Sequence, residues 1–251
     1  MNKRCVLSSI LLIGLSVFVV SVRTALSGDG RCGPFMDGTY GYEFSCELYY
    51  PDGCPTGYMP SGEQPGCCQY NWTPIAIDLD GFGIFMTNVS NGVLFDINGS
   101  GRKVRTSWLS SISNTGWLVL DRNNNGTIDN GTELFGSYTP QSTPASGMKN
   151  GFLALAVYDR PDQGGNGDGK IDAQDAVFSR LRLWVDRNVD GLTTPNELYT
   201  LASRGILSIS LDYQISRYTD QYGNIFRYRA RIRRQWGGID RWAWDIFPRL
   251  Q

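Results

Sequence analysis

Oxygen-bearing side chains alternate along a short stretch in the second half of the chain. Asp186, Asn188 and Asp190 stand two residues apart, Gly191 follows them, and Glu197 ends the stretch. A hard cation such as Ca²⁺ takes six to eight oxygen ligands, and a tight turn brings alternate side chains onto one point. The spacing therefore predicts a calcium site, with Gly191 providing the positive φ of the bend.

These positions are those of an EF-hand calcium loop, whose ligands come from loop positions 1, 3, 5, 7, 9 and 12. Leu192 would offer its backbone carbonyl at position 7, and Thr194 stands at position 9, which often acts through water. The alternative is a polar turn, because Asp and Asn favour turns. A turn does not require a glutamate at position 12, so we favour calcium binding at this loop.

A second stretch of the same kind begins at residue 121. Its predicted ligands are Asp121, Asn123, Asn125, Thr127, Asp129 and Glu133. The spacing departs from the EF-hand pattern at its end, because position 12 is Thr132 and the glutamate stands at position 13. Asp129 at position 9 can compensate, and Glu133 can reach the ion if the loop adjusts. Metal binding is expected here as well.

A third stretch supplies positions 3 to 12 only. Its predicted ligands are Asn166, Asp168, Lys170, Asp172 and Asp175, with Lys170 at position 7. Position 1 would be Gly164, which has no side chain, so Asp159 or Asp162 would have to replace it. Weaker calcium binding is expected, because the shorter aspartate at position 12 leaves less room for bidentate closure.

Four further polar residues follow two earlier apolar runs: Asp78, Asp80, Asp96 and Asn98. Each run has too few nearby oxygens to surround an ion alone. The residues could share an ion between loops or serve as turn residues, and we favour turns.

Short apolar runs lead directly into the loops that begin at Asp78, Asp96, Asp121 and Asp186, which predicts a strand before each of these four loops. Apolar and polar residues alternate at 206–213 and at 226–233, and a further apolar segment follows at 242–246. These patterns predict a C-terminal antiparallel hairpin.

Short helices are expected at 151–159, 172–181 and 195–202. Asp172 is a suitable N-cap for the second, and Pro195 suits the first turn of the third. The expected fold class is α+β: short strands feeding calcium loops, a few short helices, and the hairpin, preceded by a small disulfide-stapled cap.

One face of the strand predicted at 226–233 is basic, with Arg227, Arg229, Arg231 and Arg233 at alternate positions. This face could bind a polyanion. The alternative is a solvated outer face whose charges discourage pairing at a sheet edge, and we favour it for a chain of net charge −1.

The composition argues against several kinds of enzyme. The chain has no histidine, which excludes His-containing triads and removes the commonest general base. It has no Gly-x-Ser-x-Gly motif, and most of its acids lie in the loops described above. A non-enzymatic protein is therefore expected, although a secreted hydrolase acting through two carboxylates remains a weaker alternative.

The first 27 residues have the features of an export signal, with Lys3 and Arg4 ahead of an apolar run and small residues at 25–27. An uncleaved membrane anchor is the alternative. Five cysteines follow within a short segment, which predicts two disulfides in an oxidising compartment: Cys32, Cys46, Cys54, Cys67 and Cys68. The expected domains are a signal or anchor at 1–27, a Cys-rich cap at 28–72, and a calcium-binding module with a C-terminal hairpin at 73–251.

The ordered succession of motifs from Ile-Asp-Leu-Asp-Gly-Phe-Gly to Leu-Trp-Val-Asp-Arg-Asn-Val-Asp-Gly resembles a module of bacterial exported proteins. This EF-hand-like module occurs in RTX-type repeat proteins, and the resemblance covers about residues 74–213. It implies calcium-dependent folding outside the cell. Some relatives carry a self-processing version that cleaves an Asp-Pro bond, but this chain has no Asp-Pro dipeptide.

The expected function is that of a secreted or cell-surface protein stabilised by two or three Ca²⁺ ions, acting as a structural or interaction module. Its expected partner is an extracellular protein or glycan, with no nucleic acid, and with a membrane only if the N-terminal segment is uncleaved. An adhesin that uses its Cys- and Tyr-rich cap is the alternative.

Overall fold

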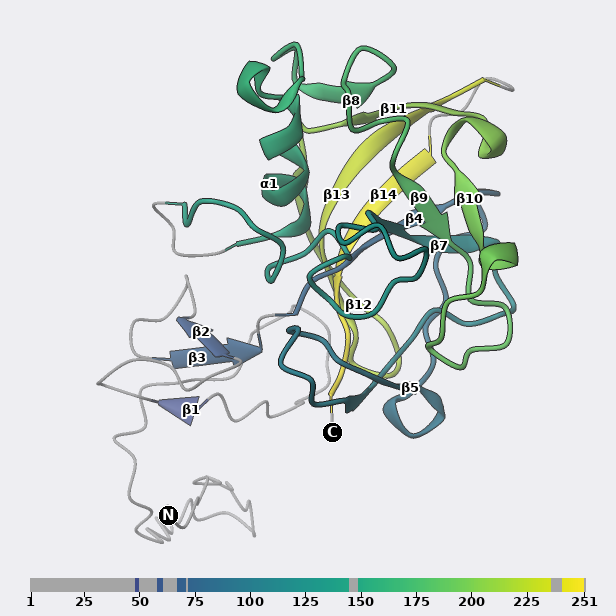
Figure 1. Ribbon diagram of the computed structural model, residues 1–251. Coiled ribbons are helices and arrows are strands. Elements are labelled where there is room, and N and C mark those ends of the chain that lie inside the picture. Colours follow the sequence, from purple (N-terminus) through teal and green to yellow (C-terminus); the bar gives the residue numbers. More distant parts are fainter. Residues whose placement is uncertain are drawn as a thin grey trace, which may run out of the picture. The chain divides into compact units, whose positions relative to one another are not determined.

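The computed structural model describes residues 72–144, 149–235 and 241–250, together with the backbone of three short strands nearer the N-terminus (Figure 1). The chain divides into two units, residues 1–69 and 70–251. The three backbone-only strands form a sheet in the order β1-β3-β2. Their bounds are Leu48–Tyr49 for β1, Tyr58–Pro60 for β2 and Cys67–Tyr70 for β3.

The predicted signal at 1–27 lies outside the described residues. The predicted disulfides fall there too, since Cys32, Cys46 and Cys54 are not described and only the backbone is described at Cys67 and Cys68. No disulfide is found in the described part of the chain.

The second unit is built on a nine-stranded sheet in which every described pairing is antiparallel. Its order is β10-β9-β7-β4-β14-β13-β11-β8, and β12 also pairs with β13. The bounds are Ile75–Asp78 (β4), Thr115–Val119 (β7), Lys170–Asp172 (β8), Arg182–Trp184 (β9), Leu198–Thr200 (β10), Ile206–Ser210 (β11), Gln214–Thr219 (β12), Ile225–Arg234 (β13) and Arg241–Phe247 (β14). A separate hairpin joins β5, Val93–Phe95, to β6, Val104–Thr106.

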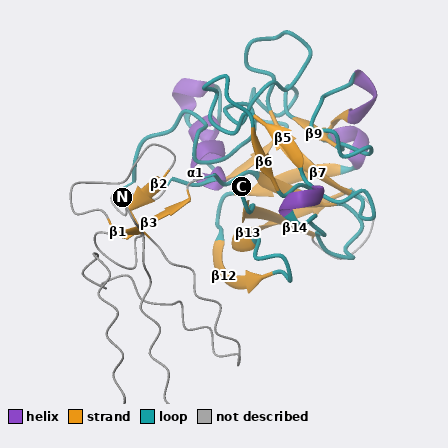
Figure 2. Ribbon diagram, turned by 90° about the horizontal axis from the view of Figure 1, so that it is seen from below, coloured by secondary structure: helices purple, strands orange, loops and turns teal. Residues whose placement is uncertain are grey.

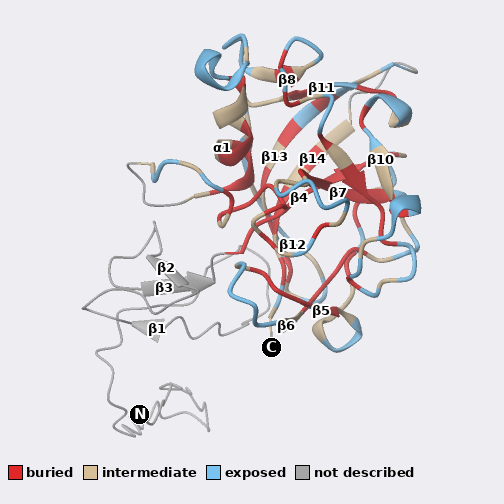
Figure 3. Cartoon of the chain, viewed as in Figure 1, coloured by how far each residue is buried: buried red, intermediate tan, exposed pale blue. Residues whose placement is uncertain are grey.

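The central strands β4 and β7 are buried on both faces (Figure 3). In β4, Ile75 and Ile77 belong to one apolar cluster, while Ala76 between them belongs to a second. In β7, Leu118 belongs to the first cluster and Trp117 to the second. A strand covered on both faces has no polar side, which explains why these segments are continuous apolar runs in the sequence.

The helix α1, Gly151–Ala156, covers one face of the sheet beside β8 and β13 (Figure 1). Its N-cap is Asn150, whose side chain accepts a hydrogen bond from the Leu153 N–H at 2.9 Å. Phe152 and Leu155 are fully buried in the first apolar cluster.

Aromatic side chains dominate the second cluster, on the other face of the sheet. The Trp108 ring lies 5.2 Å from the Trp117 ring and 5.4 Å from the Trp184 ring, centroid to centroid. Phe95 of the β5–β6 hairpin packs against Trp108 at 5.1 Å, so the hairpin, seen in Figure 2, covers this face.

The α+β expectation was wrong, because the described second unit is mostly antiparallel β and α1 is its one α-helix. Residues 173–180 form turns instead of a helix. Asp172 pairs with Ser208 in the sheet, and the Asp175 carboxylate accepts the Asp172 N–H at 2.7 Å. Such side-chain-to-backbone bonds compete with a helix, which is marginal at this length.

The helix expected at 195–202 was also wrong. Pro195–Glu197 forms a 3₁₀ turn, Leu198–Thr200 pairs with β9 as strand β10, and Ala202 begins a separate 3₁₀ turn. Pairing with a neighbouring strand has overridden the local helical signal. The other 3₁₀ turns are Val89–Asn91, Val157–Asp159, Pro161–Gln163 and Ala202–Arg204. Within the described ranges, no helix has the length and apolarity needed to cross a membrane.

Candidate metal centre

The loop 186–197 connects the paired strands β9 and β10. The Val185 N–H donates to the Glu197 carbonyl at 2.9 Å and closes the base of the loop. Strand pairing therefore places the first and last predicted ligands, Asp186 and Glu197, beside each other.

Asp186 organises the first half of this loop. Its Oδ2 accepts the Gly191 N–H at 2.9 Å and the Trp108 indole N–H at 2.8 Å, and its Oδ1 accepts the Asp190 N–H at 3.3 Å. The side chain is buried, and this burial raises the pKa of the Asp186 carboxyl against the opposing effect of its hydrogen bonds. A buried carboxylate of this kind favours a nearby cation, which would lower its pKa again.

Glu197 organises the second half of the loop. Its Oε1 accepts the Arg187 N–H at 3.3 Å, and its Oε2 accepts the N–H and the hydroxyl of Thr194 at 3.1 and 3.0 Å. The Asn188 amide donates to the Asp190 carboxylate at 2.7 Å. The side chains at loop positions 3 and 5 therefore face each other, while Leu192 exposes its side chain.

The loop 121–133, which follows β7, has the same framework: backbone N–H groups donate to its first aspartate and to its closing glutamate. Asp121 Oδ2 accepts the Gly126 N–H at 2.8 Å, as Asp186 does with Gly191. Glu133 accepts the Arg122 N–H at 2.9 Å and the Asp129 N–H at 2.8 Å. These donors stand at loop positions 2 and 9, the positions that Glu197 also caps. The additional residue before Glu133 therefore leaves its hydrogen-bonding role unchanged.

Three predicted ligands of the loop 121–133 converge on the carboxylate of a fourth. Asp129 accepts hydrogen bonds from the Asn123 amide at 2.9 Å, the Asn125 amide at 2.7 Å and the Thr127 hydroxyl at 3.0 Å. The bond from Asn123 is the leading cause that lowers the pKa of the Asp129 carboxyl. The carboxylate is thus held in its charged form, as a metal ligand must be.

The two loops touch each other at equivalent positions. The Thr193 hydroxyl lies 3.2 Å from both the N–H and the carbonyl oxygen of Ile128. Both residues stand at position 8 of their loops. The Gly131 N–H also donates to the Asp96 carbonyl at 2.8 Å, which brings the loop 96–101 to the same side.

The third candidate loop uses Asp159 as its first acid. Asp159 is buried, and its carboxylate accepts the N–H groups of Gly167 at 3.1 Å and Gly169 at 3.0 Å. Asp175 closes the loop by accepting the N–H groups of Asn166 and Asp172 at 3.3 and 2.7 Å. Asp162, the other candidate for position 1, instead pairs with Arg160 at 2.6 Å on the surface.

A lysine ammonium lies among the acids of this third loop. Lys170 Nζ is 2.8 Å from an Asp168 carboxylate oxygen and 2.5 Å from an Asp172 carboxylate oxygen. Its hydrogen bonds lower the pKa of both carboxyls. In contrast, burial and the negative charges of Asp159 and Asp172 raise the pKa of Asp175.

The loops that begin at Asp78 and Asp96 have only the first half of this framework, the hydrogen bonds to the first aspartate. Asp78 accepts the Gly83 N–H at 3.2 Å and Asp96 accepts the Gly101 N–H at 2.7 Å. Neither loop has an acid at position 9, 12 or 13. Their geometry is that of the polar turns favoured from the sequence.

The donor set suits calcium better than a transition metal. Across the described ranges, no three His, Cys, Asp or Glu side chains group in a way that could hold a metal ion. The side chains of the loops 121–133 and 186–197 provide carboxylate, amide and hydroxyl oxygens, and they include neither imidazole nor thiol groups. Mixed oxygen ligands of this kind are typical of Ca²⁺.

The loop pattern in the sequence did not reveal Trp108, which lies 78 residues from Asp186 and binds its carboxylate. An indole N–H carries no local signal, since only the tertiary fold brings it there. Asp159 and Asp162 were the two alternatives for position 1 of the third loop. The sequence could not distinguish them, because spacing across the turns between Asp159 and Asn166 does not show how close each side chain comes to the loop.

Two comparisons with known proteins are informative. Residues 75–243 match the SPM domain. This matched segment contains all three candidate loops. The chain is also 44% identical over 145 residues to the iron-regulated protein FrpA of Neisseria meningitidis serogroup C. That match covers 57% of this chain and only 12% of the relative.

Proposed function

This chain belongs to the SPM domain family, and we propose that it binds calcium in the loops 121–133 and 186–197. The loop 159–175 is proposed as a weaker third site. In this proposal the protein is exported and acts outside the cell as a structural or interaction module rather than as an enzyme.

The observation that carries the proposal is the framework shared by the two principal loops. In each, the first aspartate caps the glycine at position 6, and the closing glutamate caps the N–H groups at positions 2 and 9. Because the same capping bonds recur in two loops of different sequence, they support a common role for the two loops, and calcium binding is the role proposed.

Calcium would act on the stability of the fold. An ion that binds only the folded chain stabilises it by RT ln(1 + [L]/Kd) for each site. Extracellular modules bind calcium with Kd values of about 10⁻⁴ to 10⁻³ M, so folding would be promoted after export.

The segment that matches this chain makes up 12% of FrpA. An extracellular protein or glycan is proposed as the partner. Self-cleavage is not proposed, because the chain lacks an Asp-Pro dipeptide.

The test is thermal unfolding of the purified protein in excess EGTA and in millimolar calcium chloride. The informative variant is Asp190→Asn, because Asp190 is exposed and its replacement removes a ligand charge while leaving the buried bonds of Asp186 in place. Asp212→Asn is the matched control, since Asp212 is an exposed acid outside the loops.

We expect calcium to raise the Tm of the wild type and of Asp212→Asn by several degrees, and to raise that of Asp190→Asn distinctly less. In EGTA all three proteins should unfold at similar temperatures. A wild-type Tm that is the same in calcium and EGTA would refute the proposal.

A further inference from the structure

The arginine-bearing strand lies inside the sheet. Strand β13 pairs with β14 on one side and with β11 and β12 on the other. The strand is therefore not a sheet edge, so discouragement of edge pairing, one part of the solvated-face interpretation favoured from the sequence, does not apply to its arginines. Arg231 and Arg233 are exposed on the solvent face, whereas Ala230 and Ile232 point into the core.

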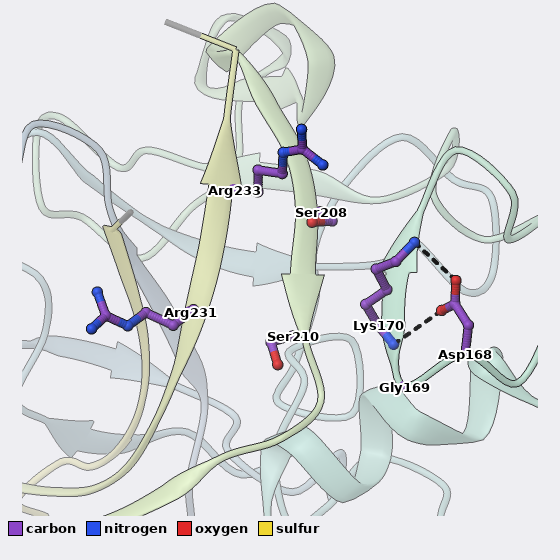
Figure 4. Close-up of a pocket in the computed structure, with 7 residues that line it drawn as sticks. All are labelled: Asp168, Gly169, Lys170, Ser208, Ser210, Arg231 and Arg233. Atoms are coloured by element: carbon purple, nitrogen blue, oxygen red, sulfur yellow. Dashed lines mark hydrogen bonds and ion pairs between the residues drawn. The ribbon is translucent and has the colours of Figure 1, made fainter. Parts of the chain in front are cut away.

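A solvent-open pocket of about 440 Å³ lies over this face (Figure 4). Its lining residues are Asp168, Gly169, Lys170, Ser208, Ser210, Arg231 and Arg233. Three are cations, one is an acid and two are hydroxyl donors. The lining therefore has an excess of positive charge.

Strand register brings these residues together. Ser208 of β11 lies opposite Arg233 of β13, and Ser210 lies opposite Lys170 of β8. Each serine thus lies opposite one cation, although Ser208 also lies opposite Asp172 of β8. In Figure 4 Arg233 extends across the strand that carries Ser208 and Ser210, Lys170 lies beyond that strand, and Arg231 lies apart on the side away from Lys170.

The two arginines keep their charge available. Within the described part of the chain, neither Arg231 nor Arg233 forms an ion pair with an acid. The Arg231 guanidinium instead lies 4.0 Å from the centroid of the Trp242 ring, which orients it without neutralising it. Lys170, in contrast, is shared with Asp168 and Asp172.

We propose that this pocket binds a sulfate or phosphate group, either as a free ion or as an ester on a sugar. Guanidinium groups donate paired hydrogen bonds to tetrahedral oxyanions, and the serine hydroxyls add neutral donors. The volume lies within the roughly 300–1,000 Å³ typical of small-molecule sites, which leaves room for a sugar beside the anionic group. The pocket lies outside the loops 121–133 and 186–197, but it shares Asp168, Gly169 and Lys170 with the loop 159–175, the proposed weaker calcium site.

The test is calorimetric titration of the purified protein in a calcium-containing buffer at constant ionic strength. The probes are sodium sulfate, glucose 6-sulfate and glucose 6-phosphate, with glucose as the neutral control. The informative variant is Arg233→Ala, and Arg217→Ala is its control because Arg217 is an exposed cation outside the pocket.

We expect saturable binding of at least one anionic probe and none of glucose. Arg233→Ala should weaken binding by about tenfold or more, the effect of losing a charged hydrogen-bond donor, while Arg217→Ala should leave it unchanged. Tighter binding of the esters would identify a sugar ester as the ligand, and tighter binding of sulfate would identify the free ion; both results support the pocket.

The inference would be overturned if no anionic probe binds saturably. Equal weakening by Arg233→Ala and Arg217→Ala would also overturn it, because binding would then follow net charge rather than the pocket. Matching circular dichroism spectra of the two variants would show that both remain folded.

Discussion

The loops 186–197 and 159–175 hold similar acids in different surroundings. In the first, Asp186 is buried against the aromatic cluster and bonds to the Trp108 indole. In the second, the acids Asp168 and Asp172 already share the ammonium of Lys170 at the surface. The comparison indicates that the first loop is integral to the core, whereas the second has an internal counter-ion and depends less on an added cation.

The largest difference is expected from removing the first acid of each loop. Asp186→Ala would leave the buried Trp108 indole N–H and the Gly191 N–H without their acceptor, at a cost of about 2–4 kcal/mol even in EGTA. Asp159→Ala would free two glycine N–H groups in a more exposed loop and should cost about 1 kcal/mol. Urea unfolding in EGTA would measure both values, and equal costs would contradict the distinction between the loops.

A smaller difference is expected at the bend glycines. Gly191 has φ 69° and a Cβ there would lie 2.9 Å from the Val93 Cβ, whereas Gly169 has φ 83° and open space around it. Gly169→Ala should cost about 1–2 kcal/mol through backbone strain alone, and Gly191→Ala should cost more because Val93 must also move. Denaturant midpoints would compare them, and a greater loss in Gly169→Ala would show that loop 186–197 is not packed as described.

The smallest effect is expected at Lys170. Replacing it with methionine removes the ammonium that competes with a metal ion, so calcium affinity at the loop 159–175 should rise roughly twofold to fivefold, as expected for losing exposed ion pairs. Arg180→Met is the matched control, because Arg180 is an exposed cation outside this loop. Calcium titration followed by calorimetry would detect the change. Unchanged affinity in Lys170→Met would mean that the ammonium does not compete.

The sequence predicted best what is encoded locally. The acids of the loop 186–197 lie within one twelve-residue segment, so their spacing alone indicated the turn that Asp186 and Glu197 cap. The alternation of Phe226, Tyr228, Ala230 and Ile232 likewise indicated a strand with one buried face, and β13 has that face.

Predictions failed where a distant segment decided the outcome. Residues 198–200 carry a helical signal but pair with β9, and Asp172 pairs with β11 instead of starting a helix. The position of β13 inside the sheet depends on β11, β12 and β14, so the alternating arginines alone could not distinguish a central strand from an edge.

The most direct test of calcium binding in the principal loops is calorimetric titration of calcium into chelator-treated protein, comparing the wild type with Asp190→Asn. We expect saturable binding of two or three ions by the wild type and distinctly weaker binding of one of them by the variant, which keeps an amide oxygen at position 5 as Asn125 does in the loop 121–133. An absence of saturable binding, or identical binding by both proteins, would contradict this expectation.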